Sequence, residues 1–447
     1  MAEAELATHP EILITEWESA GPDTHVALRN LSLGPDDAIA AACDPLRRQV
    51  DVRQERAGVR VNATSFVGRI QVGPLRVTIK PKLHPEPLSQ LLRYAYGIDD
   101  LALQAVLPTG LVSSGLHDLL VAMLVHEVER LLRLGLARQY IRMAEDLALP
   151  RGRIAIGTIA ARGGILEARL PCVFHDRSLD WSLNCIVRTG LARAAMLASP
   201  GPLARHAARL ETSFADFVGP LRLDVAEVER AEAVLTRLTA RYRPTLALIR
   251  LICGADGVAL EATRKNAAVS GFLFDMNRFF QRLLSRFLRE NLADGHVEDE
   301  RSIRTMLTYD PAANPRRRAA PALRPDFAIF RHRRLRFYAD AKYRDVWANG
   351  MPMSWLYQLH AYAGAAPDRL SIMLYPSDDP KAQPERLIGR PPAGDGPSTA
   401  IALRPIYLPA IAVAVSSSRA GAGKSKQAVA YSMVWGSETP TTGRAAE

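Results

Sequence analysis

The sequence predicts a multi-domain α/β protein with a β-rich N-terminal lobe, a helical region and a C-terminal α/β sandwich around a mixed sheet. Three observations support this fold class. Short runs of alternating apolar and polar residues fill residues 10–83, and apolar residues recur at helical spacing through most of residues 86–253. After residue 263, helical and strand-like segments alternate. A chain of 447 residues is long enough for two or three such domains, each with its own core.

The predicted N-terminal lobe consists of short strands. Alternation of apolar and polar side chains over residues 10–83 is typical of strands with one buried face, and Gly73-Pro74 supplies a turn between two of them. Several short strands with turns between them predict a small barrel or sandwich. The helical region follows at residues 86–253, and its most regular segment, LHDLLVAMLVHEVERLLRLGL, ends at Gly135.

Two segments interrupt the helical region. RIAIGTI, residues 153–159, predicts a short β segment. The segment HDRSLDWSLN brings His175, Asp176 and Asp180 close in sequence, as in a metal site. We interpret it instead as the start of a helix, with Ser178 or Asp180 as the N-cap.

Residues 263–412 form the predicted C-terminal domain. The expected order is a helix at 271–288, a β-hairpin, a helix at 354–365, the strand RLSIMLYP and further strands near 399–415. The tail at 413–447 is rich in Ser, Ala, Gly and Thr, which predicts flexibility. Its AGAGKSK segment resembles a phosphate-binding loop, but Ser418 stands where that motif requires glycine, so no nucleotide site is expected.

The hairpin, LRPDFAIFRHRRLRFYADAKYRDV, carries the candidate chemistry. Asp326 and Asp340 are the carboxylates that would hold Mg²⁺, and the metal would polarise a phosphate and help to deprotonate water. Lys342 would stabilise developing negative charge or orient that water. Only seven of the 57 basic residues are lysine, so a lysine beside the two carboxylates is unusual for this chain. An exposed hairpin with a solvated polar face is the alternative interpretation.

The hairpin register decides whether the two carboxylates meet. A three-residue loop, His332 to Arg334, would pair Arg331 with Leu335 and set Asp326 opposite Asp340. A loop of two or four residues would place them on opposite faces. The hypothesis therefore requires an odd loop or a β-bulge. In the helical run WLYQLHAYA that follows, Gln358 and Tyr362 lie four residues apart on one face.

Charge, cysteine content and hydropathy indicate the kind of partner and the cellular environment that suit this chain. The net charge of +10 favours a polyanionic partner such as nucleic acid. The four cysteines are far apart, which favours free thiols in a reducing cytoplasm over zinc binding or a disulfide framework. The first residues are acidic and lack an apolar core, so no signal peptide is expected. The sequence contains no apolar stretch of about 18 residues, so no membrane span is expected.

The hairpin resembles the PD-(D/E)xK nuclease core, and the chain resembles the McrC family, the nuclease subunits of McrBC-type restriction systems that cut modified DNA. The resemblance spans roughly residues 10–376 in the order of the family. It is carried by SFVGRIQVGPLRVTIKPKL with LLRYAYG, by RGRIAIG with PCVFHDRSLDWSLN, by GFLFDMNRFFQRLLSRFL, and by LRPDFAIF through DAKYR and YQLHAYA.

This resemblance implies a Mg²⁺-dependent endonuclease that cuts double-stranded DNA carrying a 5-methylcytosine-type modification. It also implies a McrB-type AAA+ partner that binds and hydrolyses GTP, is stimulated by residues 1–262, and leaves this chain without a GTP site. Gln358 and Tyr362 would orient phosphate or Lys342, and the carbonyl of Ala341 would add a metal ligand. Six further residues would approach the DNA backbone: Tyr343, Arg344, Arg316, Arg317, Arg318 and Arg324.

One position departs from the family pattern. The family reads Phe-Glu where this chain has Phe280-Gln281, and glutamine brings no charge to a metal. Two alternatives therefore stay open. One is an assembly and GTPase-stimulating module whose nuclease centre has decayed, and the other is a standalone repair nuclease with the same core.

Overall fold

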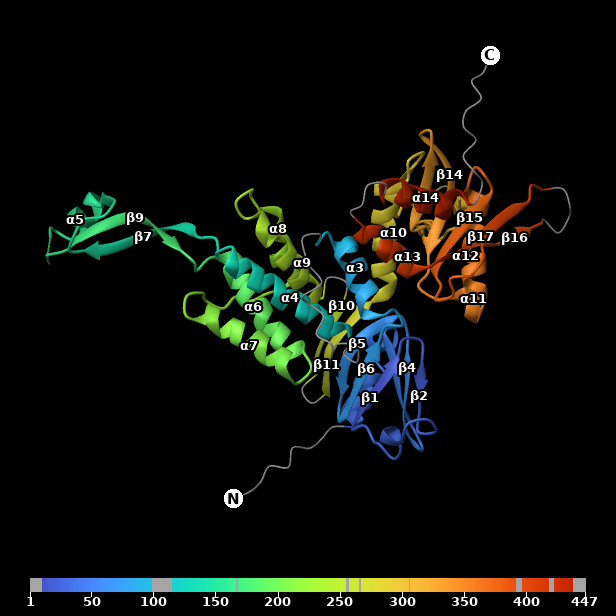
Figure 1. The fold of residues 1–447 in the computed structure, drawn as a ribbon, viewed down its shortest axis with the longest axis horizontal. Coiled ribbons are helices and arrows are strands. Elements are labelled where there is room, and N and C mark those ends of the chain that lie inside the picture. The colour runs from blue at the N-terminus through green and yellow to red at the C-terminus, as the bar shows by residue number, and fades with distance from the viewer. Residues whose placement is uncertain are drawn as a thin grey trace, which may run out of the picture.

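The computed structural model describes residues 10–98, 115–165, 168–254, 257–264, 267–304, 306–390, 396–417 and 422–436. The chain is a multi-domain α/β protein, as the sequence predicts. Figure 1 shows the N-terminal sheet at the centre, the C-terminal domain on one side, and a helical region with a long arm on the other.

The N-terminal lobe contains two sheets. One has the order β1-β6-β5-β11-β10 with β1 parallel to β6, and the other has the order β2-β4-β3. Gly73 has a φ of +54° at the predicted turn between β5 and β6, which glycine adopts without strain. The strands of the lobe are β1 (Glu11–Thr15), β2 (Ser19–Ala20), β3 (Val50–Glu55), β4 (Gly58–Ala63), β5 (Phe66–Val72) and β6 (Leu75–Lys80). Short helices α1 (Pro35–Ala41) and α2 (Asp44–Arg47) and a 3₁₀ turn at Val26–Leu28 complete it.

Strands β10 (Gly257–Arg264) and β11 (Ala267–Asp275) complete the five-stranded sheet from a distant part of the sequence. β11 is antiparallel to β5, with Asp275 opposite Phe66. A division at residue 262, as the sequence suggested, would cut through β10. The lobe therefore extends to Asp275, because the open edge of β5 is paired by residues beyond the helical region.

The helical region packs between the lobe and the arm. Its helices are α4 (Leu116–Arg133), α6 (Ser182–Leu197), α7 (Pro202–Ala215), α8 (Val225–Ala233) and α9 (Arg243–Ile252), with a 3₁₀ turn at Ala240–Tyr242. α3 (Pro85–Tyr96) precedes them in the chain and packs mainly on two helices of the C-terminal domain. α4 is buried over most of its surface, because α6, α7 and α9 all pack on it. α3 begins at Pro85 and ends at Gly97, whose φ of +70° closes the helix in the left-handed conformation.

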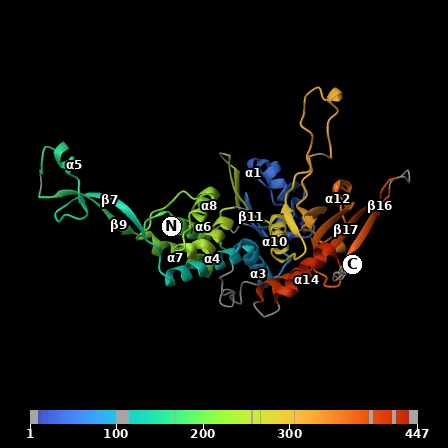
Figure 2. The same ribbon diagram turned by 90° about the horizontal axis from the view of Figure 1, so that it is seen from above.

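A three-stranded arm projects from the helices (Figures 1 and 2). It contains β7 (Gln139–Leu147), β8 (Arg153–Ile154), α5 (Ile156–Ala161) and β9 (Leu170–Ser178). The expectation that Ser178 or Asp180 caps a helix is wrong. His175, Asp176 and Ser178 lie on β9, and α6 is preceded by Trp181, which makes no side-chain cap. The β segment predicted at 153–159 is two residues of strand followed by α5. Strand pairing with β7 overrides the local capping signals.

The C-terminal domain is a six-stranded mixed sheet in the order β12-β13-β14-β15-β17-β16. β14, β15 and β17 are parallel, and the other neighbours are antiparallel. The strands are β12 (His296–Asp299), β13 (Phe327–Arg331), β14 (Arg334–Ala341), β15 (Leu370–Pro376), β16 (Glu385–Gly389) and β17 (Thr399–Ile406). The helices are α10 (Met276–Asn291), α11 (Val346–Asn349), α12 (Met353–Ala365), α13 (Leu408–Ser416) and α14 (Ala422–Trp435), with a 3₁₀ turn at Pro311–Ala313.

Helices cover both faces of this sheet. Tyr338 packs on Tyr362 of α12, whereas its neighbour Phe337 packs edge-on against Trp435 of α14. Consecutive strand residues point to opposite faces, so α12 and α14 lie on opposite sides of β14. α10 starts at Asp275, whose carboxylate accepts from two backbone amides of the first turn.

The predicted flexible tail is wrong for the part that the structure describes. α14 packs against the sheet, and Ala430, Met433 and Val434 are buried. Arg404 donates a hydrogen bond to the carbonyl of Met433 at 2.7 Å. The small residues of this segment suggested disorder, but the apolar residues near its end cover Phe337, a contact that sequence composition does not reveal.

Candidate functional site

A β-bulge brings the two predicted carboxylates together. The hairpin loop has two residues, His332 and Arg333, with φ of +50° and +64°, a combination typical of a tight type I′ turn. The loop is therefore not the three-residue loop expected from the sequence, and the β-bulge that the hypothesis required as the alternative is present. The register shifts by one between Ile329 and Phe330, so Phe330 pairs with Leu335 and Ile329 with Phe337. Arg336 is the extra residue, and the ladder ends with Phe327 opposite Ala339, so the next residues along the two strands, Asp326 and Asp340, face each other.

Asp326, Asp340 and Lys342 form a compact cluster at the ends of β13 and β14. The amide of Asp326 lies 3.4 Å from Oδ1 of Asp340, and the amide of Ala341 donates to Oδ2 of Asp326 at 2.7 Å. Nζ of Lys342 lies 2.6 Å from Oδ2 of Asp340. Asp340 is only 1% exposed, whereas the side chain of Lys342 is 22% exposed, so the cluster opens to solvent at its lysine end.

Burial and the repulsion between the carboxylates of Asp326 and Asp340 destabilise the doubly ionised form of this cluster. Burial, together with the adjacent Asp340 carboxylate, raises the pKa of Asp326 to about 7, although its hydrogen bond from Ala341 and the charge of Lys342 act in the opposite direction. Oδ2 of Asp340 is buried and makes the ion pair with Lys342, yet it accepts no hydrogen bond from the described residues. One ammonium group thus faces two adjacent carboxylates.

The residues present fit a divalent cation. A cation between the carboxylates would offset their repulsion and would occupy the free coordination capacity of Asp340. Mg²⁺ is commonly held by one or two carboxylates and completes its shell with water and phosphate. Within the described part of the chain, no group of three or more His, Cys, Asp or Glu side chains gathers as a metal site. Metal binding here, including the Ala341 carbonyl as a ligand, stays a prediction.

Gln358 and Tyr362 lie beside this cluster on α12. Nε2 of Gln358 donates to the Tyr362 hydroxyl at 2.8 Å, and that hydroxyl donates to the carbonyl of Arg324 at 3.1 Å. Burial, followed by the nearby charges of Asp340 and Asp326, raises the pKa of Tyr362 to about 12. Tyr362 therefore stays protonated and anchors α12 to the segment that leads into Asp326.

The structure separates the predicted DNA-contacting residues into two groups. Arg316, Arg317, Arg318 and Arg324 are exposed. They lie on the connection between β12 and β13, which stands away from the sheet in Figure 2. Tyr343 is 5% exposed and its hydroxyl donates to Glu16, so the expectation that Tyr343 touches DNA is wrong. Arg344 is half-buried over the ring of Trp17.

Sequence reasoning missed two neighbours of the site. Nζ of Lys342 lies 5.8 Å from the ring centroid of Trp355, a cation–π distance. Trp355 lies three residues before Gln358, and this helical spacing was a usable signal. Glu16 reaches Tyr343 from 327 positions away in the chain, and no sequence pattern points to that contact.

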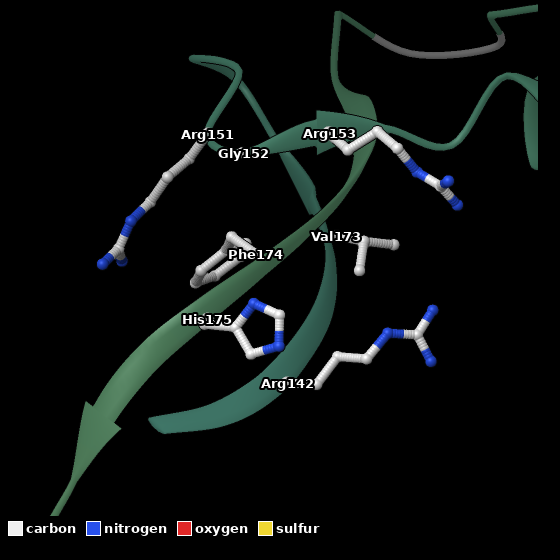
Figure 3. Close-up of a pocket in the computed structure, with 7 residues that line it drawn as sticks. All are labelled: Arg142, Arg151, Gly152, Arg153, Val173, Phe174 and His175. Carbon is white, nitrogen blue, oxygen red and sulfur yellow. The ribbon is translucent and has the colours of Figure 1, made fainter. Parts of the chain in front are cut away.

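A second concave feature lies on the arm, away from the carboxylates. It is a shallow pocket of about 620 Å³ lined by Arg142, Arg151, Gly152, Arg153, Val173, Phe174 and His175. Figure 3 shows Arg151 beside the Phe174 ring, whereas Arg142 and Arg153 extend on the other side, past Val173. Arg151 lies over that ring, 4.6 Å from its centroid, and also pairs with Asp176. The side chains that line the pocket include three arginines and a histidine and no carboxylate.

Comparisons with known proteins agree with this architecture. The model of the family described as McrBC 5-methylcytosine restriction system component matches residues 61–376, more than half of the chain. A chain in a solved assembly of Thermococcus gammatolerans McrB AAA+ hexamers with bound McrC is 17% identical with a TM-score of 0.64, covering 94% of this chain and 98% of that one. A chain of the Thermococcus gammatolerans McrBC complex is 19% identical with a TM-score of 0.47, covering 63% and 88%. No curated protein matches the chain.

Proposed function

The chain belongs to the McrBC family of 5-methylcytosine restriction system components, and on this premise we propose that it is the DNA-cutting subunit of such a system. The observation that carries the proposal is the bulged hairpin, which sets Asp326 opposite Asp340 with Lys342 2.6 Å from Asp340. The mixed sheet with helices on both faces is consistent with a PD-(D/E)xK nuclease domain. Asp326, Asp340, Lys342, Gln358 and Tyr362 are its proposed site residues.

Each side chain has a distinct proposed task. Asp326 and Asp340 would hold Mg²⁺, which supplies Lewis-acid activation of a phosphate and acidifies a water molecule when it is bound. Lys342, fixed by Asp340 and partly exposed, would stabilise the charge that develops on the phosphate. The Gln358–Tyr362 pair keeps α12 in position over the carboxylates.

The exposed arginines provide a route for DNA to the site. Arg316, Arg317 and Arg318 lie on the connection that leads into Asp326, and Arg324 is two residues before it. Guanidinium groups bind phosphate oxygens without reading base sequence. We therefore assign backbone contact to this connection and leave recognition of the modified base to the partner.

The proposed partner is a McrB-type AAA+ protein that hydrolyses GTP. The fold resembles a chain from an assembly of McrB AAA+ hexamers with bound McrC. No phosphate-binding loop is complete in this sequence, because Ser418 replaces the required glycine. GTP hydrolysis would therefore belong to the partner, and this chain would stimulate it.

The decisive experiment measures DNA cleavage by the chain with its partner, GTP and Mg²⁺. Asp340→Asn and Lys342→Gln should each lower the cleavage rate by at least about 100-fold, because each removes charge from the reacting centre. Asp340→Asn is preferable to alanine, since Asp340 is buried and truncation would leave a cavity. Asp368→Asn is the control, because this carboxylate pairs with Arg336 near the turn end of the hairpin.

Partner-stimulated GTP hydrolysis should persist in all three variants. Cleavage by Asp340→Asn at the wild-type rate would refute the assignment of the site residues. GTPase stimulation without any wild-type cleavage would instead support the module with a decayed nuclease centre. Cleavage that needs neither partner nor GTP would support the standalone nuclease.

A further inference from the structure

The residues that follow Lys342 are held by the N-terminal lobe. Tyr343 and Arg344 continue from the end of β14, and they contact Glu16 and Trp17, which continue from the end of β1. Two consecutive residues of one domain thus contact two consecutive residues of another. The contact lies beside the proposed catalytic lysine, although its two sides are more than 300 positions apart in sequence.

Tyr343 is the buried half of this contact. Its hydroxyl donates to Oε1 of Glu16 at 3.0 Å, and its ring packs 5.8 Å from that of Phe280. The same Glu16 oxygen accepts from the amide of Lys82 at 2.7 Å. One carboxylate oxygen therefore joins the lobe backbone to the segment that carries Lys342.

Trp17 and Arg344 form the outer half. Cζ of Arg344 lies 5.6 Å from the centroid of the Trp17 ring. Trp17 has a φ of +65°, which is unfavourable for a bulky residue, and its amide donates to the carbonyl of Thr64 at 3.2 Å. The lobe thus holds Trp17 in a conformation that costs free energy and that presents its ring to Arg344.

This arrangement restricts the backbone of Lys342 on both sides. Its amide donates to the carbonyl of Leu374 at 3.0 Å, and its carbonyl accepts from the amide of Arg344 at 2.9 Å. Asp340 precedes it inside the sheet, and Tyr343 follows it inside the contact with Glu16. Movement of the lobe relative to the sheet would shift Lys342 away from Asp340.

We propose that the Glu16–Tyr343 hydrogen bond is a positioning device through which the N-terminal lobe holds Lys342 in its productive place. The proposal rests on the nuclease function proposed above, and it adds that the lobe is part of the cutting machinery rather than only a docking domain.

The chemistry of Glu16 supports a specific role. Oε2 of Glu16 is buried and has no hydrogen-bond partner among the described residues. Burial raises the pKa of Glu16 to about 7, with Asp378 acting in the same direction and Lys82 in the opposite one. The adjoining cavity is about 20 Å³, which is room for one water molecule. An apolar side chain would fill this position at a lower cost in free energy, so stability alone does not explain why the chain buries a carboxyl group here.

The experiment compares Tyr343→Phe, Glu16→Ala and Glu16→Gln in the full chain with its partner and GTP. Tyr343→Phe keeps the ring and removes only the hydroxyl. We expect kcat for DNA cleavage to fall between about tenfold and 100-fold in Tyr343→Phe and Glu16→Ala, with KM for DNA unchanged. Glu16→Gln keeps an acceptor oxygen and should retain cleavage within about twofold. The double variant Glu16→Ala with Tyr343→Phe should be no slower than either single variant.

The matched control is Tyr375→Phe. Tyr375 lies on the adjacent strand, and its buried hydroxyl has no hydrogen-bond partner among the described residues. Its removal should leave kcat unchanged. An equal loss in this control would show that any change in the sheet slows cleavage, which would overturn the positioning role.

A second measurement does not depend on cleavage. The chain has only seven lysines, so the rate at which an amine-reactive reagent modifies each can be followed by mass spectrometry. Lys342 should react at least about threefold faster in Tyr343→Phe, because its segment would open more often, and at the wild-type rate in Glu16→Gln. Exposed Lys381 is the internal reference.

The outcomes separate the two proposals. Suppose that wild-type cleavage depends on Asp340, but that Tyr343→Phe changes neither kcat nor the reactivity of Lys342. This result would overturn the positioning role and leave the proposed nuclease function intact. Absence of Asp340-dependent cleavage would overturn the nuclease, whereas faster Lys342 modification would still establish that the lobe holds this lysine.

Discussion

Two carboxyl groups, Asp326 and Glu16, have pKa values raised to about 7, and burial is the largest cause in both. They differ in what surrounds them. Asp326 faces the second carboxylate, Asp340, and two adjacent carboxylates suit a cation. Glu16 faces a tyrosine hydroxyl and a backbone amide, which are hydrogen-bond donors. The same shift thus accompanies a proposed metal ligand in one case and a domain contact in the other.

Glu16 should make stability depend on pH. Its pKa is raised on folding, so the folded state binds the proton more tightly. Its favourable contribution is complete below the ordinary glutamate pKa of 4.5 and is lost as pH rises through about 7. By pH 8 the loss amounts to roughly 3 kcal/mol. Glu16→Gln should therefore gain thermal stability relative to wild type between pH 5 and pH 8, as measured by the midpoint of thermal unfolding. The exposed Glu18→Gln is the control, and a pH-independent difference for Glu16→Gln would contradict the assignment.

Gln281 is a second position to test. Its neighbour Phe280 packs on Tyr343, three residues after Asp340, so this turn of α10 lies near the end of β14. Gln281→Glu is nearly isosteric, and a carboxylate facing the site should lower the Mg²⁺ concentration needed for half-maximal cleavage by several-fold. Glu298→Gln, on the edge strand β12, is a charge-change control. An unchanged Mg²⁺ dependence would place residue 281 outside the metal's surroundings.

At the scale of elements, the β-bulge at Arg336 controls the site. A two-residue turn alone would place Asp326 and Asp340 on opposite faces, and the extra residue restores them to the same face. A glycine inserted between Phe337 and Tyr338 should therefore abolish cleavage, because it moves Asp340 one position along the ladder and to the opposite face of the sheet. Deletion of Arg336 should instead preserve cleavage, because Ile329 would still pair with Phe337 across a regular two-residue hairpin and Asp326 would still face Asp340.

The control for this test is Arg336→Ala, which removes the ion pair with Asp368 but keeps the bulge. It should cleave DNA at close to the wild-type rate. Full activity in the glycine-insertion variant would show that the site does not depend on this register.

At the scale of the whole molecule, the arm is the most exposed part of the N-terminal region (Figure 1). It displays large apolar side chains that a monomer has little reason to expose: Tyr140, Leu149, Ile156 and Ile165. It also carries the arginine-lined pocket. We expect the partner to bind this region rather than the nuclease domain.

The arm can be removed without opening the helical region, because its ends, Gln139 and Ser178, are paired with each other. Replacement of residues 139–178 by a short turn should abolish co-elution with the partner in the presence of a non-hydrolysable GTP analogue. A fragment ending at Asp275, which keeps β11, should still bind. The original boundary at residue 262 would leave the edge of β5 unpaired. Binding that survives loss of the arm, or that requires residues 276–436, would contradict this assignment.

The sequence by itself determined the local elements, the order of the domains and the residue types of the site. The apolar periodicity of α4 and α10 and the alternation along β5 and β6 are properties of short segments, which is why they can be read directly. The family resemblance was also visible before the structure, and the match to residues 61–376 confirms it. Asp326, Asp340 and Lys342 can be recognised in the sequence because two carboxylates followed by a lysine suit metal-dependent phosphodiester cleavage.

Only the tertiary structure decided which distant segments meet. β11 joins the N-terminal sheet, α14 covers Phe337, and Glu16 reaches Tyr343, all through contacts between residues far apart in sequence. The bulge at Arg336 was foreseen only as one of two ways to align the carboxylates, since turn type and register depend on packing of both strands against the helices. Local sequence encodes propensity and chemistry, whereas long-range packing determines which of the permitted arrangements has the lowest free energy.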